Sequence, residues 1–265
     1  MSKKMQVDLN GKVAIITGAG GVIGKATAME FARNGAKVII AGRTLSTLEA
    51  TRDEIREAGG DCTAVTADIS NKVQTVTLVE TAIKQYGGLD ILVNNAGIGA
   101  GPEERKNFWE FSDDLWDKII AIDLNGVYYC SKPAAKYMIE HGGGCIINVA
   151  SITGIVPLRL QCAYVAAKAA VINLSKAMAL ELADKGVRVN VIAPGSVLNE
   201  TLKEVFYSDK ERTEAMLSHI PMHRTGEPAE LAAMACFLAS DDASYLTGSV
   251  HVVDGGWICG YTRNF

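Results

Sequence analysis

The segment Lys12–Arg43 reads KVAIITGAGGVIGKATAMEFARNGAKVIIAGR and decides the fold. Its two ends, 12–17 and 36–43, are apolar and rich in β-branched residues, which is typical of strands buried on both faces. The glycine-rich turn Thr17–Gly24 lies between the first strand and a helical stretch. Strand, turn, helix and strand within about thirty residues form a βαβ unit. Backbone N–H groups at such a turn bind a pyrophosphate, so the segment favours a dinucleotide site over a plain turn.

The alternation of strands and helices continues along the chain. Further helical stretches are expected at 44–59, 72–87, 113–142, 158–184 and 227–240. Further buried strands are expected to end near Asp68, Asn94, Ser151 and Pro194, with a last one in 248–256. The stretch 113–142 reads as one long helix with a bend near Gly126 or Pro133. Seven strands alternating with six helices predict an α/β fold, with a Rossmann-like, doubly wound parallel sheet and helices on both faces.

We expect a single domain over 1–265, because the sequence has no internal repeat, low-complexity run or linker. The core of this domain spans 10–256. A partly helical lid is expected at 196–226, and an aromatic tail follows at 257–265. Candidate ligand residues stand where the predicted strands end: Gly18, Arg43, Asp68, Asn94, Ser151 and Pro194. In open α/β sheets, ligands bind at the carboxyl ends of the strands.

Composition excludes several classes of protein. The 265 residues are 48% hydrophobic and 21% charged, which is ordinary for a soluble globular domain. A net charge of −4 gives no reason to expect a nucleic acid or an anionic membrane as partner. The opening MSKKMQVDLNGKVAIITG lacks a signal-peptide core, so a cytoplasmic location is expected. Six scattered cysteines without a CxxC pair, and four histidines without metal spacing, predict reduced thiols and no metal site.

Tyr164 and Lys168 stand four residues apart in a helical stretch, so they share one helix face. A phenol is a poor acid–base catalyst at neutral pH, but an adjacent cation favours the phenolate. Ser151, thirteen residues before Tyr164, would hydrogen-bond the reacting oxygen. A solvent-facing tyrosine and lysine on an amphipathic helix are the alternative, and the spacing alone does not decide between the two.

Together these residues resemble the classical short-chain dehydrogenase/reductase family. The resemblance runs from Asn10 to Gly256. It rests on the Thr17–Gly24 turn, Asp68, Asn94-Asn95-Ala96-Gly97, Ser151 with Tyr164 and Lys168, Pro194-Gly195, and Asp254-Gly255-Gly256. The family implies a nicotinamide dinucleotide and reversible hydride transfer between an alcohol and a ketone.

The resemblance also implies roles for individual residues. Tyr164 is the general acid in carbonyl reduction and the base in alcohol oxidation, Ser151 positions the substrate oxygen, and Lys168 holds the nicotinamide ribose. Asn94 lines the adenosine side, and Asp68 meets the adenine. The full set expected to bind the cofactor is Gly18, Gly20, Gly21, Val22, Ile23, Gly24, Arg43, Thr44, Asp68, Ile69, Asn94, Asn95, Ala96, Gly97, Tyr164, Lys168, Pro194, Gly195, Val197 and Asn199.

The sequence departs from the family pattern at three positions. Val22 replaces the middle glycine of the turn, and Asn199 replaces a threonine after the Pro-Gly turn. Asp123 aligns with the family's catalytic asparagine, whereas Asn125 is two residues later and points about 200° away on a helix. We therefore expect Asp123 to take the asparagine's place in a proton relay, with a surface-facing Asp123 as the alternative.

The end of the second strand indicates the cofactor. Enzymes specific for NAD place an Asp or Glu there to bind the ribose 2′-OH. Gly42 stands at this position and is followed by Arg43 and Thr44. Because a guanidinium binds a 2′-phosphate, the sequence predicts NADP, with NAD as the alternative.

The substrate is expected to be a small-molecule alcohol or ketone: a polyol, a sugar acid, a keto-sugar, or a bulkier cyclic alcohol such as a steroid. A 3-oxoacyl reductase of the same family is the alternative function. The segment MIEHGGGCIIN at 138–148 argues against it, because it lacks the basic residues that bind an acidic carrier protein. A non-catalytic dinucleotide-binding protein would not need Ser151, Tyr164 and Lys168.

Arg159 would meet an acidic substrate unless it is a solvated loop arginine. Five further large side chains either line the substrate pocket or serve ordinary packing, and the sequence favours neither: Trp109, Phe206, Tyr207, Met216 and Met222.

Two helical stretches, 114–141 and 158–184, carry apolar residues on more than one face. These residues include Ile119, Ile120, Tyr128, Val171 and Leu174. Surplus apolar surface is typical of an interface. Together with the family resemblance, it predicts a homotetramer, in which the tail 257–265 reaches a neighbouring subunit.

Overall fold

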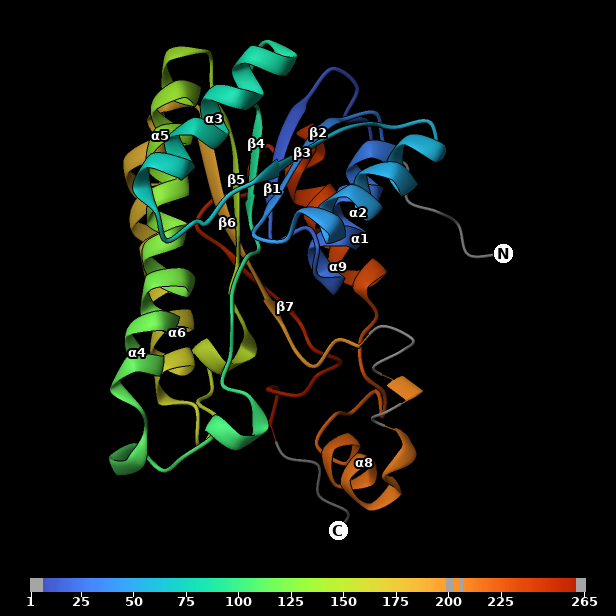
Figure 1. Cartoon of the computed structure of the whole chain (residues 1–265), viewed down its shortest axis with the longest axis vertical. Coiled ribbons are helices and arrows are strands. Elements are labelled where there is room, and N and C mark those ends of the chain that lie inside the picture. Colours follow the sequence, from blue (N-terminus) through green and yellow to red (C-terminus); the bar gives the residue numbers. More distant parts are fainter. Residues whose placement is uncertain (1–6, 199–202, 205–206, 261–265) are drawn as a thin grey trace.

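The computed structural model describes residues 7–198, 203–204 and 207–260. A seven-stranded sheet with the order β3-β2-β1-β4-β5-β6-β7 forms its centre (Figure 1), and every strand pair is parallel. The strands are β1 (Val13–Thr17), β2 (Lys37–Gly42), β3 (Asp61–Thr66), β4 (Ile91–Asn94), β5 (Gly144–Val149), β6 (Val187–Pro194) and β7 (Val250–Val253). The predicted doubly wound α/β fold is confirmed.

Helices cover both faces of this sheet (Figure 1). One face carries α1 (Val22–Arg33), α2 (Leu45–Glu57) and α9 (Pro228–Ala239). The other carries α3 (Lys72–Tyr86), α4 (Asp113–Ile119), α5 (Gly126–Glu140) and α6 (Cys162–Leu182). Single 3₁₀ turns lie at Pro102–Glu104, Phe108–Glu110, Ile152–Gly154, Ala183–Lys185 and Asp241–Ala243, and α8 (Lys210–Leu217) lies apart from the sheet.

Two hydrophobic cores lie between these layers, because side chains of a strand alternate between its faces. In β1, Ile16 packs into the core that contains Phe31, whereas Ile15 packs into the core that contains Met138. All five residues of β1 are buried. Continuous apolar strands therefore serve both cores at once, as expected for a parallel sheet covered on both faces.

The stretch 113–142 differs from the single long helix expected for it. A π-helical turn, Ile120–Asn125, separates α4 from α5. The irregularity ends where Gly126 begins α5, whereas Pro133 lies inside α5 without ending it. Gly126 packs closely against Ile69, since a Cβ at Gly126 would lie 2.6 Å from the Ile69 side chain. Single π turns occur mostly at functional sites.

Only some of the residues expected to form an interface are exposed. Ile119 and Val171 are fully buried in the cores of the subunit, so they contribute nothing to an outer surface. Tyr128 on α5 is exposed, as are Trp116 on α4 and Leu180 on α6. By length and composition α6 is apolar enough to cross a membrane. In the structure, α6 packs against β6 and the π turn.

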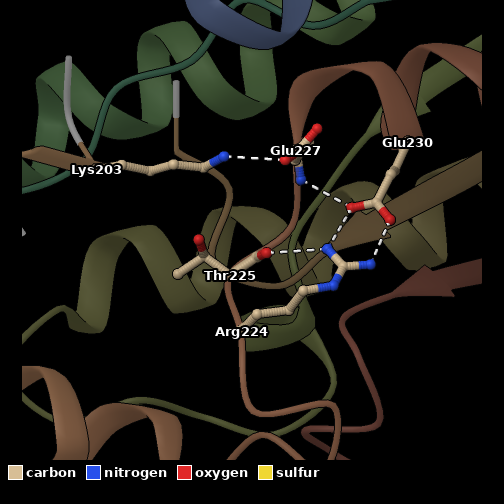
Figure 2. Close-up of polar contacts among 5 residues, drawn as sticks. All are labelled: Lys203, Arg224, Thr225, Glu227 and Glu230. Atoms are coloured by element: carbon tan, nitrogen blue, oxygen red, sulfur yellow. Dashed lines mark hydrogen bonds and ion pairs between the residues drawn. The ribbon is translucent and has the colours of Figure 1, made fainter. Parts of the chain in front are cut away.

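The lid expected at 196–226 is helical at α8 within the described residues. Its end is tied to the start of α9 by a polar network (Figure 2). Arg224 forms a two-pronged ion pair with Glu230 at 2.6 and 3.0 Å, and Lys203 pairs with Glu227 at 3.0 Å. Glu230 also accepts from the Glu227 N–H at 2.8 Å, which caps α9. The pair with Arg224 lowers the pKa of Glu230.

Candidate active site

Two cavities lie side by side at the carboxyl edge of the sheet. The first has a volume of about 380 Å³ and follows the glycine turn to the ends of β2 and β3. The second has a volume of about 480 Å³ and lies over the ends of β5 and β6. Ile23, Asn95, Gly97, Ile98 and Val197 line both cavities. The two therefore form one continuous site, with room for a long ligand beside a smaller one.

Ser151, Tyr164, Lys168 and Asp123 all line the second cavity. Ser151 stands two residues after the end of β5 at the N-cap of a 3₁₀ turn, where its Oγ accepts from the Thr153 N–H at 3.1 Å. Tyr164 and Lys168 lie one turn apart on α6, and Lys168 Nζ is 5.5 Å from the centre of the tyrosine ring. Residues from three separate parts of the chain thus meet around one space.

Lys168 is almost completely buried, although it carries a charge. Its Nζ donates to the Val149 carbonyl at 3.2 Å and lies 3.0 Å from Asp123 Oδ2. A buried charge requires such partners because desolvation is costly. The backbone of β5 and the carboxylate of Asp123 together fix the ammonium within reach of the cavity.

Asp123 projects from the π turn and is fully buried. Its Oδ1 accepts from the Ile98 N–H at 2.8 Å, while Oδ2 faces Lys168. Burial raises the pKa of Asp123, and the attraction of Lys168 and the Ile98 N–H opposes that rise. The structure thus brings Asp123 to the lysine and turns it away from the surface, and its role in a proton relay stays a prediction.

The absence of a side chain at Gly97 makes room for this ion pair. A Cβ at Gly97 would lie 2.7 Å from Asp123 Oδ2 and 3.1 Å from Lys168 Nζ. Any other residue at this position would therefore push the two charges apart. Asn125 lines neither cavity, which agrees with the expectation that it does not replace the missing asparagine.

The glycine turn fits a dinucleotide pyrophosphate. Gly18 has a φ of +65°, and a Cβ there would lie 2.7 Å from the Ala96 backbone. Helix α1 begins at Val22 with Gly21 at its N-cap and without a side-chain cap. Its first N–H groups and its positive dipole end therefore face the cavity without a side chain in front of them. Val22 in place of the family's middle glycine lines the cavity without closing it.

Two glycines of the turn serve packing and do not line either cavity. A Cβ at Gly24 would lie 2.5 Å from the Gly18 carbonyl, and one at Gly20 would lie 2.5 Å from Thr47 Oγ1. Thr44 likewise lies outside the cavity lining and takes the N-cap position of α2. These three residues shape the site without forming its wall.

Arg43, Asp68, Ile69 and Ala96 line the far end of the first cavity. The Asp68 carboxylate accepts from the Ser70 Oγ at 2.7 Å and the Ser70 N–H at 2.9 Å, and these bonds lower its pKa. Gly42 lines the same end, and no acidic side chain occupies its position. A cation and a fixed carboxylate therefore stand at the end where the adenosine was expected.

Asn94 is placed differently from its expected role. It is buried in the sheet, where its amide donates to Asn148 Oδ1 at 2.8 Å and to Ser131 Oγ at 2.9 Å. The structure therefore assigns it to the sheet and not to the adenosine side. Asn95 lines both cavities and donates to the Thr17 carbonyl at 2.9 Å.

Some of the remaining residues expected at the site line a cavity and others do not. Pro194, Gly195 and Val197 line the second cavity, whereas Asn199 lies outside the described residues, as does Phe206. Arg159 is exposed and lines neither cavity. No group of three metal-ligating side chains occurs in the described part of the chain.

Among the polar side chains that line the second cavity, sequence reasoning missed Arg105 and Gln161. Gln161 stands three residues before Tyr164 at the start of α6, so helix periodicity was a usable signal for it. Arg105 lies in an irregular loop after β4, where no periodicity applies. It is exposed and lines the second cavity, and nothing in the sequence indicates that.

Comparison with known proteins agrees with this geometry. The family model described as enoyl-(acyl carrier protein) reductase matches residues 18–258. Cyclohexanol dehydrogenase of an Acinetobacter species is 39% identical over 97% of this chain and 99% of that protein. 3β-Hydroxysteroid dehydrogenase 2 of Eggerthella lenta is 37% identical over 94% of this chain and 95% of that protein.

Solved structures show the same relationship. A gluconate 5-dehydrogenase homologue from Beutenbergia cavernae with bound NADP, described as NAD(P) dependent, superposes with a TM-score of 0.87 at 37% identity. The match covers 96% of this chain and 99% of that one. A 2-deoxy-D-gluconate 3-dehydrogenase homologue from Agrobacterium tumefaciens with bound NADP gives 0.86 at 33%, covering 96% and 98%. The chain belongs to the classical short-chain dehydrogenase/reductase family.

Proposed function

We propose that the protein is an NAD(P)-dependent oxidoreductase that interconverts a secondary alcohol and a ketone. The observation that carries the proposal is the meeting of Ser151, Tyr164 and Lys168 around one cavity that is continuous with the glycine-turn cavity. A dinucleotide along the first cavity would bring its nicotinamide toward these side chains. Two NADP-bound structural relatives support the choice of cofactor.

Each residue has a chemical task in this proposal. The nicotinamide supplies or accepts the hydride. Tyr164 transfers the proton at the substrate oxygen, and Ser151 donates a hydrogen bond to that same oxygen. Lys168 presents its ammonium beside the tyrosine, where a positive charge favours the phenolate. Asp123 holds the ammonium and, as we propose, takes part in returning the proton from solvent.

The substrate we favour is a sugar, a polyol or a sugar acid. The NADP-bound relatives named for gluconate and deoxygluconate support this choice. The relative named for a hydroxysteroid keeps a steroid alcohol as the alternative. A 3-oxoacyl reductase is disfavoured, because the end of α5 and the loop after it carry Glu140, His141 and glycines where a carrier protein would need basic residues.

Replacement of Tyr164 by Phe tests the proposal. The change removes the proton-transferring hydroxyl and leaves the ring, so kcat should fall by about 10²–10⁴-fold. Absorbance of NADPH at 340 nm across a panel of ketones measures this. Tyr245→Phe is the control, because Tyr245 is fully exposed and lines neither cavity. A Tyr164→Phe enzyme that retains more than a tenth of wild-type kcat would refute the assignment.

A further inference from the structure

The charges that line the second cavity do not balance. Three of its lining residues carry a charge: Lys168, Asp123 and Arg105. Lys168 and Asp123 neutralise each other at 3.0 Å. Arg105 has no hydrogen bond or ion pair among the residues that the structure describes. The cavity therefore carries one uncompensated positive charge, that of the exposed Arg105, since Asp123 offsets the charge of Lys168.

The neighbouring acidic residue does not supply the missing charge. The Glu104 carboxylate turns back to accept from the Gly101 N–H at 2.7 Å and caps its own 3₁₀ turn. Arg105 directly follows that turn. The loop thus uses its glutamate for its own conformation and leaves Arg105, an exposed residue of the cavity lining, without that partner.

Gln161 is a second polar side chain on the same wall. It is only 8% exposed, yet its side chain makes no hydrogen bond with any described residue. Its Oε1 lies 3.6 Å from the position of a Cβ on Gly99, which lines the cavity. Its amide atoms are not among the fully buried unpaired ones, so they stay accessible at the cavity wall, where an amide both donates and accepts hydrogen bonds.

We propose that Arg105 and Gln161 form a specificity subsite for a small polyhydroxy acid, with Arg105 on its carboxylate and Gln161 on a neighbouring hydroxyl. A planar guanidinium matches a carboxylate with two parallel hydrogen bonds. The reacting hydroxyl lies at Ser151 and Tyr164, so one molecule spans the cavity between them. This inference rests on the proposed oxidoreductase function and narrows its substrate to an acid.

A neutral ligand fits the same wall poorly. A steroid or a simple cyclic alcohol covers Arg105 and Gln161 without offering them a partner, and such sites discriminate strongly against ligands that leave polar groups unpaired. The volume of about 480 Å³ lies in the lower part of the range for small-molecule sites. Size and polarity therefore agree on a short, hydroxylated acid.

The test compares aldonates of four to six carbons with the alditols of the same length, using the wild type and three variants. Arg105→Met keeps the length of the side chain and removes its charge, and Gln161→Leu removes the amide. Arg159→Met is the matched control, because Arg159, like Arg105, is an exposed arginine but lines neither cavity.

We expect the wild type to prefer an aldonate over its alditol by about 100-fold in kcat/KM. Arg105→Met should lose roughly 10- to 100-fold on the aldonate, mainly through KM, and change the alditol by less than about twofold. Gln161→Leu should lower kcat/KM on both the aldonates and the alditols. Arg159→Met should have the same kcat/KM values as the wild type. Equal use of acid and alditol, or equal losses on both in Arg105→Met, would overturn the subsite.

Failure of the proposed function gives a separate result. If neither series is oxidised or reduced with NADP or NAD, the oxidoreductase assignment is wrong. Calorimetric titration of the Tyr164→Phe protein with the aldonates then decides the subsite by itself. Binding that disappears when Arg105→Met is added supports it, and the absence of binding to Tyr164→Phe overturns it.

Discussion

At the scale of single residues, the pair of Lys168 and Asp123 determines how the site responds to pH. The two charges lie 3.0 Å apart and both are buried. An ammonium favours the phenolate of Tyr164, whereas a carboxylate beside that ammonium offsets part of its effect. Related enzymes with an asparagine at this position have no such opposing charge.

This opposition gives a prediction for the Asp123→Asn variant. Without the carboxylate, the phenolate forms more readily, so the rising limb of the pH–rate profile for alcohol oxidation should move down by roughly one pH unit. Burial raises the pKa of Asp123, whereas the Lys168 ammonium and the Ile98 N–H oppose that rise and favour its carboxylate. Steady-state rates from pH 5 to 10 measure the shift of the limb, and a limb that moves upward would contradict the prediction.

Asp123→Ala separates the charge of this residue from its hydrogen bonds. Alanine leaves the Ile98 N–H and the Lys168 ammonium without their partner. We therefore expect a larger loss of kcat in Asp123→Ala than in Asp123→Asn, because the asparagine keeps an oxygen that accepts from Ile98. Full activity of Asp123→Ala with an unchanged pH profile would exclude Asp123 from the proton relay.

At the scale of elements, the end of β2 determines the cofactor that we propose. Gly42 has an ordinary φ, and a Cβ there would make normal contact with Leu48 at 3.4 Å. The space therefore admits an aspartate. Arg43 lines the same end of the cavity and offers a guanidinium for a 2′-phosphate.

We predict that Gly42→Asp shifts the ratio of kcat/KM for NADP and NAD at least tenfold toward NAD. The new carboxylate repels a 2′-phosphate and accepts from a 2′-OH. Arg43→Met should lower kcat/KM for NADP and leave that for NAD nearly unchanged. A wild type that prefers NAD tenfold would contradict the proposed preference.

The elements themselves were largely predictable from the sequence. Buried strands such as β1 and β6 are continuous apolar runs between turn residues, and their carboxyl ends locate the site. The π turn was not predictable, because Ile120–Asn125 has ordinary helix-forming residues and its extra residue appears only in the hydrogen-bond ladder. Arg105 was missed for a related reason, since the direction of a loop side chain depends on tertiary packing.

Asn94 shows a different limit of sequence reasoning. A polar residue at a strand end was read as a ligand residue, but its amide bonds to Asn148 and Ser131 inside the sheet. The sequence reveals that a polar group stands at the edge. It does not reveal whether that group points along the strand into the cavity or sideways to a neighbouring strand.

At the scale of the whole molecule, we propose a homotetramer. Ile119 and Val171 belong to the subunit core, so the candidate surface consists of the exposed side chains Trp116, Tyr128 and Leu180. Light scattering at micromolar concentration should give about four times the subunit mass of 28.2 kDa. Tyr128→Glu should lower that mass, because a carboxylate cannot be buried unpaired in an apolar contact. A monomeric wild type would refute the assembly.

The π turn between α4 and α5 has a consequence for insertions and deletions. A π turn is an α-helix with one additional residue, so removing one residue from Ile120–Asn125 would restore an unbroken helical ladder. A deletion of this kind normally breaks a helix, whereas here it would regularise one. The deletion would rotate Asp123 by about 100° relative to α5, so Asp123 would lose its ion pair with Lys168. At this point of the chain, the best helix and the working site require different numbers of residues.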